Sequence, residues 1–204
     1  AGRNVAVGIT ALGAITTGDY NTALGHDALR LNTTGSYNSA LGWRALYSNT
    51  TGENNVALGH DALYYNTSGA QNTAIGNDAL LWNKQAHGNT GVGYRALLYS
   101  ETGDGNTALG WRAGDGITSG SNNTIIGYDA DLSIWNASNQ IVIGKGATGQ
   151  GDNYAVIGNA DVTRVYAAQD AGATLYAGGL NIGGTAVSST AAELNLLDGG
   201  TSVG

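Results

Sequence analysis

The chain has 204 residues, with 34 glycines, a formal net charge of −7 and no Pro, Cys, Met or Phe. Because large apolar side chains are few, a thick globular core is difficult to fill at native packing density, and we expect thin layers of Ala, Val, Ile and Leu instead. The 8 Lys and Arg residues are spread singly and no apolar run approaches the roughly 20 residues that cross a bilayer, so we expect neither nucleic-acid binding nor membrane insertion by this segment.

A repeat of 17 residues runs through most of the chain. At every step a marker glycine follows an aliphatic residue, and in all but the last copy an asparagine stands four residues before the glycine. The marker glycines are Gly8, Gly25, Gly42, Gly59, Gly76, Gly93, Gly110, Gly127 and Gly144, and the asparagines are Asn4, Asn21, Asn38, Asn55, Asn72, Asn89, Asn106 and Asn123. A step of fourteen residues then leads to a weaker copy at Gly158. Nine copies in one register exclude composition bias as their origin.

The length of the period predicts the architecture. Seventeen residues are too few for helical repeats, which need more than about thirty, and too many for a heptad. The segments around the marker glycine are short and aliphatic, and turns such as Asn-Thr-Thr-Gly separate them, which is typical of strands. We therefore expect an all-β fold over residues 1–160. It is a parallel β-roll or β-solenoid of about nine 17-residue coils, with neighbouring coils about 4.8 Å apart.

Each column of equivalent residues then has an expected role. We expect the marker glycine at a corner with positive φ, or where another backbone passes closely. The Asn column is expected to stack, amide upon amide. Two aliphatic columns are expected to point inward, one directly before the glycine and one four residues after it. The first is Val7, Leu24, Leu41, Leu58, Ile75, Val92, Leu109, Ile126 and Ile143, and the second is Leu12, Leu29, Leu46, Leu63, Leu80 and Leu97.

Charged residues form a further column two positions after the marker glycine. Its members are Asp27, Arg44, Asp61, Asp78, Arg95, Arg112 and Asp129. Most neighbours in this series carry opposite charge, as expected for residues that face each other on adjacent coils. We expect Asp27 to face Arg44, whereas the pairs Asp61/Asp78 and Arg95/Arg112 interrupt the alternation.

The copies NTALGHDAL, NSALGWRAL, NVALGHDAL and NTAIGNDAL resemble the N-S-V-A-I-G-x-x-A head repeat of trimeric autotransporter adhesins of the YadA type. The match covers residues 4–147, and the fourteen-residue step to Gly158 equals the usual repeat length of that family. The resemblance implies a left-handed parallel β-roll in a homotrimer, with small residues packed toward the trimer. The period here is three residues longer, which we expect to lengthen the outer loop.

The period is lost over residues 161–204, which we interpret as a C-terminal fibre segment. Alternation broken by Gly pairs predicts short strands. Thr190 and Glu193 form a capping box and Gly199 a stop signal, which predicts a short helix at about 190–198. The stretch TAAELNLLDG is similar to a motif of phage tail-fibre shafts, which favours a viral fibre.

Aromatic residues recur five and six positions after the marker glycine, at the start of the variable loop. They are Tyr47, Tyr64, Tyr65, Trp82 and Tyr99. A column of rings can stack on sugar faces, so we name these residues as candidate contacts for a host-cell surface glycan or protein receptor. The alternative is that the rings pack between the chains of a trimer.

We expect a non-enzymatic, structural and receptor-binding segment of a trimeric attachment fibre: a phage tail fibre, or alternatively an adhesin on a bacterial surface. An ice-binding solenoid and a glycan-degrading tailspike are weaker alternatives. The regular placement of the carboxylates favours a structural role over catalysis. His26 and His60, two coils and therefore about 10 Å apart, cannot easily share a metal. We expect no catalytic residue, no metal and no cofactor, and the sequence leaves the receptor open.

Overall fold

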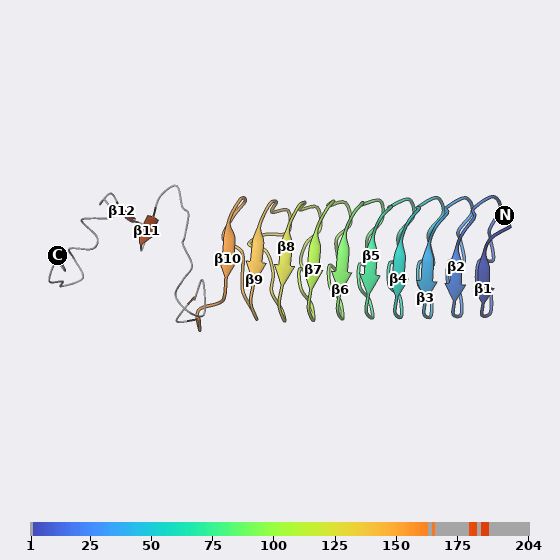
Figure 1. The fold of residues 1–204 in the computed structure, drawn as a ribbon, viewed down its shortest axis with the longest axis horizontal. Coiled ribbons are helices and arrows are strands. Elements are labelled where there is room, and N and C mark those ends of the chain that lie inside the picture. Colours follow the sequence, from blue (N-terminus) through green and yellow to red (C-terminus); the bar gives the residue numbers. More distant parts are fainter. Residues whose placement is uncertain (1, 163–164, 166–179, 183–184, 188–204) are drawn as a thin grey trace, which may run out of the picture. The chain divides into compact units, whose positions relative to one another are not determined.

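The computed structural model describes residues 2–162, 165, 180–182 and 185–187. By its internal contacts the chain divides into two units, Ala1–Val162 and Thr163–Gly204. In the first unit, ten strands of three residues each form one sheet whose order follows the chain (Figure 1). They are β1 (Val5–Val7), β2 (Thr22–Leu24), β3 (Ser39–Leu41), β4 (Val56–Leu58), β5 (Thr73–Ile75), β6 (Thr90–Val92), β7 (Thr107–Leu109), β8 (Thr124–Ile126), β9 (Ile141–Ile143) and β10 (Ala155–Ile157).

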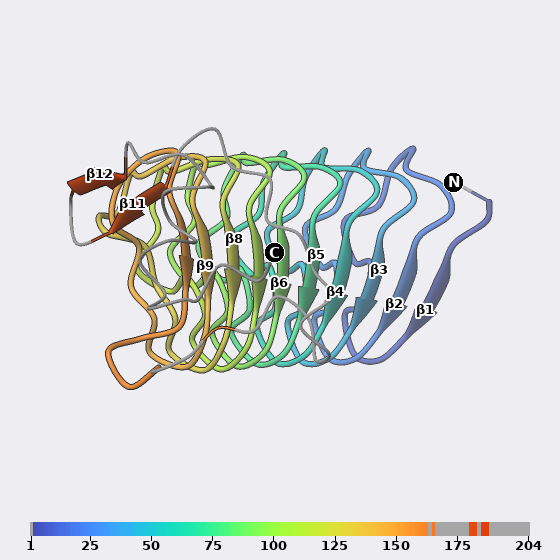
Figure 2. The ribbon, with the colours of Figure 1, turned by 60° about the vertical axis from the view of Figure 1, so that its left-hand side comes forward.

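Every neighbouring pair of these strands is parallel and in register. Val5 pairs with Thr22, and the same offset of 17 residues continues to β9. Between β9 and β10 the offset is fourteen, since Ile141 pairs with Ala155. The predicted parallel β-solenoid of about nine 17-residue coils is therefore confirmed, and Figure 2 shows the coils as a stack of similar loops behind the strands.

The expected orientation of the strands is wrong. The residue before the marker glycine points outward: Leu24, Leu41 and Leu58 are 44%, 45% and 40% exposed. The central Ala of each strand points inward instead, and Ala23 and Ala74 are fully buried. The reason is the strand period of two. Asn21 directs its amide across the coil to the carbonyl oxygen of Gly35, so Asn21 and Ala23 share the inner face and Leu24 lies on the outer one.

The core is one column of leucines packed against small residues. Leu29, Leu46, Leu63, Leu80 and Leu97 are fully buried, as predicted, and form one cluster with the buried alanines. A coil of 17 residues encloses room for one large side chain per layer, because the opposite wall contributes only alanine at most levels. The core is therefore thin and continuous along the axis, as the composition suggested.

Two ladders of buried asparagines hold the coils together. In the first, Asn55 receives the backbone amide of Asn72 on its Oδ1, while its own Nδ2 donates to Asn38 Oδ1 and to the carbonyl oxygen of Gly69. The predicted stacking of this column is confirmed. A second ladder, of Asn32, Asn49, Asn66 and Asn83, follows the opposite turn. All four of its members are fully buried.

In the second unit, β11 (Leu180–Ile182) and β12 (Thr185–Val187) form an antiparallel pair. These are short strands of the kind predicted for the C-terminal segment. The helix expected at about 190–198 lies outside the described residues, which themselves contain no helix.

Candidate functional site

The residues that follow the marker glycine form one wall of the solenoid, which we call the aromatic wall. Within each coil the third and fourth of these residues, for example Ala28 and Leu29, point into the core. The first, second, fifth and sixth lie outside the leucine core and are mostly exposed or half-buried, although Asp27, Asp61 and Leu98 among them are buried. Because the coils are in register, side chains from equivalent positions form rows along the axis.

Four of the five predicted receptor contacts come together in this wall. The rings of Tyr47 and Tyr64 are stacked at 5.0 Å, and those of Tyr65 and Trp82 at 4.2 Å. Tyr64 and Tyr65 meet edge to face at 4.6 Å, so the four rings form one aromatic stack. Burial raises the pKa of the Tyr64 hydroxyl. Tyr99 is 47% exposed and is not among the ring pairs of the described residues.

Cations cover both ends of the aromatic stack. The guanidinium of Arg30 lies 5.8 Å from the ring centre of Tyr47, and the ammonium of Lys84 lies 5.7 Å from that of Trp82. Arg44 lies over Tyr64 at 4.8 Å and over Trp43 at 3.7 Å. The faces of these four rings are engaged by each other and by these cations, so the wall offers ring edges and phenolic hydroxyls to a ligand rather than free ring faces.

Two further aromatic rows lie outside the predicted contacts. The residue directly after the glycine stacks along the axis, as in Trp43 with His60 at 4.5 Å and Trp111 with Tyr128 at 4.6 Å. Tyr20 also stacks on Tyr37 at 4.9 Å, a pair that the sequence analysis missed. The sequence does indicate this pair, because Tyr20 and Tyr37 both stand directly before the repeated asparagine.

Three of the four neighbouring pairs of opposite charge in the column are in contact, and the pair Asp27/Arg44 is not. Arg44 holds Asp61 through two contacts of 2.5 and 2.8 Å, and not Asp27. Asp27 pairs with Arg30 of its own coil at 3.1 Å and accepts a hydrogen bond from Thr10. Asp27 does not pair with Arg44 of the next coil because Arg30, three positions away on its own coil, already contacts its carboxylate. Farther along, Arg95 pairs with Asp78 at 3.2 Å, and Arg112 contacts both Asp115 at 2.6 Å and Asp129 at 3.4 Å.

One carboxyl group stands apart from this column. Burial raises the pKa of the Asp131 carboxyl above its usual value of 3.8, and the nearby Asp115 and Asp129 add to the effect. The oxygen Oδ1 of Asp131 accepts the backbone amide of Leu132 at 2.8 Å. A folded state with a raised carboxyl pKa binds its proton more tightly than the unfolded chain does, so ionisation of Asp131 costs stability.

This cost predicts a pH dependence for Asp131→Asn. The cost is absent below the unfolded pKa of 3.8 and grows as the pH rises through the higher folded pKa. We therefore expect the wild-type chain to lose stability relative to Asp131→Asn between about pH 3 and pH 7. Urea unfolding of both proteins at the two pH values measures the difference. A difference that is independent of pH would contradict the assignment.

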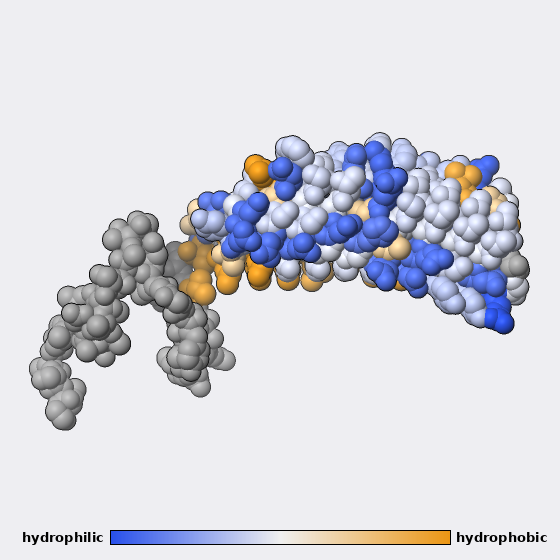
Figure 3. All heavy atoms as spheres, turned by 90° about the horizontal axis from the view of Figure 1, so that it is seen from above, coloured by the Kyte–Doolittle hydropathy of each residue, from blue (hydrophilic) through white to orange (hydrophobic). Residues whose placement is uncertain are grey.

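The outer side of β2–β9 is a second notable surface, which we call the sheet face. Besides the exposed Leu24, Leu41 and Leu58, it carries Ile75 and Leu109, both more than one-third exposed. A shallow apolar groove lies on β2–β4, lined by Thr22, Leu24, Ser39, Ala40, Leu41, Val56, Ala57 and Leu58. In Figure 3 apolar residues gather along the left part of the lower edge of the solenoid, whereas the face toward the viewer is mostly of intermediate hydropathy with patches of hydrophilic residues.

Comparisons of this chain with models of protein families, with curated proteins and with solved structures found no match. Within the described residues, no helix is both long and apolar enough to cross a membrane.

Proposed function

We propose that this chain is a non-enzymatic, structural and receptor-binding segment of a homotrimeric attachment fibre, of the phage tail-fibre kind, carried on the virion. A bacterial surface adhesin of the same build is the alternative carrier. The observation that supports the proposal is the sheet face, a row of exposed aliphatic side chains that recurs once per coil. Exposed apolar surface of this extent is typical of a protein interface.

The regularity of the sheet face favours further copies of the same chain as its partners. Successive aliphatic side chains on this face are spaced by the distance between parallel strands, about 4.8 Å. A surface that complements such a row over many coils needs the same spacing, which a second copy has. The resemblance to trimeric adhesin heads favours three chains over two.

In such a fibre the aromatic wall is the surface proposed to meet the receptor. Its polar groups are the phenolic hydroxyls of Tyr47, Tyr64 and Tyr65 and the cations that cover the stack. Ring edges, hydroxyls and guanidinium groups suit a glycan that is bound by hydrogen bonds along its edge. Tyr47 stacks on Tyr64 and Tyr65 stacks on Trp82 across adjacent coils, which restricts the motion of these four rings.

The oligomeric state tests the proposal. Light scattering on the whole chain is expected to give three times the 20.6 kDa of one chain. Leu58→Lys places a charge in the middle of the sheet face and is expected to shift the mass toward that of a single chain. Leu31→Lys is the matched control, because Leu31 and Leu58 are both 40% exposed, but Leu31 lies outside the sheet face.

A folded wild-type chain with the mass of one copy would refute the proposed trimer. Equal effects of the two lysine variants on the mass would show that the sheet face is not the contact surface. Binding of host cells by the trimer, lost on Tyr65→Ala without loss of the trimer, would support the aromatic wall as the receptor contact.

A further inference from the structure

The charge column has one place where two carboxylates are neighbours along the axis. Asp61 and Asp78 occupy equivalent positions on adjacent coils, and like charges that face each other destabilise a ladder. Each has its arginine on the far side, Arg44 for Asp61 and Arg95 for Asp78. The space between the two carboxylates therefore receives no cation from the column itself.

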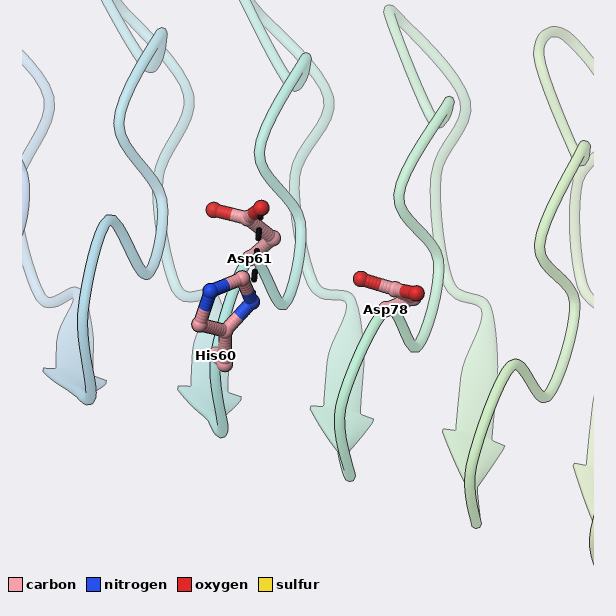
Figure 4. A group of neighbouring side chains, drawn as sticks. All are labelled: His60, Asp61 and Asp78. Carbon is pink, nitrogen blue, oxygen red and sulfur yellow. Dashed lines mark ion pairs between the residues drawn. The ribbon is translucent and has the colours of Figure 1, made fainter.

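A histidine stands beside this space. His60 directs Nδ1 toward Asp61 Oδ2 at 3.4 Å, as Figure 4 shows, with Asp78 on the next coil. His60, Asp61 and Asp78 each offer one ligand atom, and the three atoms lie within 4.8 Å of one another. Asp61 is buried and Asp78 half-buried, so the backbone positions of both carboxylates are fixed by the coils.

One imidazole nitrogen and two carboxylate oxygens are a donor set for a particular class of ion. Zinc and related divalent transition metals accept imidazole and carboxylate together at about 2.0–2.2 Å. Calcium and magnesium favour oxygen ligands alone. Three protein ligands on one side also leave positions for water, as in open zinc sites. Two atoms that each lie about 2.1 Å from one ion are at most about 4.2 Å apart, so the side chains of this cluster have to close on the ion from separations of up to 4.8 Å.

Arg44 limits the strength of such a site. Its guanidinium contacts both oxygens of Asp61, and a metal ion has to share that carboxylate with it. A carboxylate has about four lone-pair positions, so it can accept Arg44 on one oxygen and the ion on the other. The two positive charges nevertheless compete, and removal of Arg44 is expected to tighten metal binding.

We propose that His60, Asp61 and Asp78 bind one divalent transition-metal ion, of the zinc class, that joins two adjacent coils. This site fills the one break in the charge column where two carboxylates meet. It does not depend on the proposed attachment function, since it requires only the stacked coils.

The chain offers a closely matched control. The sequence Gly-His-Asp-Ala-Leu occurs at 25–29 and again at 59–63. In the first copy the residue that follows in the column is Arg44, whereas in the second it is Asp78. His26 contacts Asp27 at 3.0 Å, much as His60 contacts Asp61, but it has no second carboxylate on the next coil. Only the second copy is therefore expected to bind the ion.

Calorimetric titration of the chelator-treated whole chain with zinc chloride tests the site. We expect one ion per chain. His60→Ala and Asp78→Asn should each weaken binding at least by the roughly 10- to 100-fold that the loss of even an outer-shell partner costs. His26→Ala/His87→Ala, which removes the other two histidines, should bind as the wild type does. Arg44→Gln should bind more tightly.

Several results would overturn the proposed site. These are the absence of saturable zinc binding to the wild type, an equal loss in the His26→Ala/His87→Ala protein, or retention of binding in both His60→Ala and Asp78→Asn. Circular dichroism of each variant shows whether the solenoid is intact. Asp78→Asn keeps the shape of the side chain, so it provides the decisive measurement if His60→Ala disturbs the stack on Trp43.

Discussion

Gly59→Ala is expected to destabilise the solenoid by about 4 kcal/mol or more, a large effect for a single methyl group. Gly59 has a φ of +143°, a region that residues with a Cβ adopt only at a cost of about 1–3 kcal/mol. In addition, a Cβ at this position would overlap the carbonyl oxygen of Gly76 on the next coil. Because that oxygen belongs to the backbone, the overlap can be relieved only by moving whole coils apart.

Gly146→Ala separates the two contributions. Gly146 also has a positive φ, of +59°, but nothing lies within 4 Å of a Cβ added there. Its replacement should therefore cost only the conformational part, about 1–2 kcal/mol. Urea unfolding monitored by circular dichroism, at one fixed protein concentration, compares the two variants with the wild type. Equal losses would show that the close passage of neighbouring glycines does not limit the spacing of the coils.

The marker glycine illustrates how much of this fold follows from the sequence. A fixed period together with an obligatory Gly and Asn predicted stacked parallel coils, the leucine core and the asparagine ladder, and these predictions are confirmed. The orientation of the strands was predicted wrongly. Leu24 and Leu29 are equally apolar, so their side chains do not reveal that only Leu29 is buried; the hydrogen bond of Asn21 across the coil goes with an inward Ala23 and an outward Leu24.

The corner after the glycine could not be predicted from local preferences. Asp61 and Leu63 have φ values of +55° and +54°, although leucine and aspartate with their Cβ atoms disfavour this region. The register of the neighbouring coils imposes it, because the backbone amides of both residues bond to carbonyl oxygens of the coils on either side.

In the candidate site, too, some features could be predicted from the sequence and others could not. The rows of Tyr, Trp and charged residues were visible in the sequence, since they depend only on the period. Their partners were not, because Arg44 has Asp27 and Asp61 as neighbours on either side and the sequence does not rank them. The structure gives Asp61 two contacts with Arg44 and leaves Asp27 to Arg30 and Thr10. The cluster around His60 has a different origin, the succession of Asp61 and Asp78 on adjacent coils, which the period alone shows.

Asn55→Ala is expected to cost about 2–4 kcal/mol, because it interrupts the first asparagine ladder in its middle. The three hydrogen bonds of the Asn55 side chain do not contribute equally to this loss of free energy. The carbonyl oxygen of Gly69 keeps a second donor, Nδ2 of Asn66 at 3.0 Å, and Asn38 Oδ1 keeps the backbone amide of residue 55. The backbone amide of Asn72, however, loses Asn55 Oδ1 at 3.0 Å and has no alternative acceptor of that kind on the alanine.

An unpaired amide in the interior carries the desolvation penalty of about 1–3 kcal/mol, and the two lost side-chain bonds add to it. Asn136→Ala is the control, because Asn136 is exposed and its replacement should change the free energy of unfolding by about 0.5 kcal/mol or less. Hydrogen exchange of Asn55→Ala should also locate the change. The backbone amide of Asn72 is expected to lose its protection first, since it is the group left without a partner. If Asn72 stays protected while the free energy falls, the ladder acts through packing of the amides rather than through their hydrogen bonds.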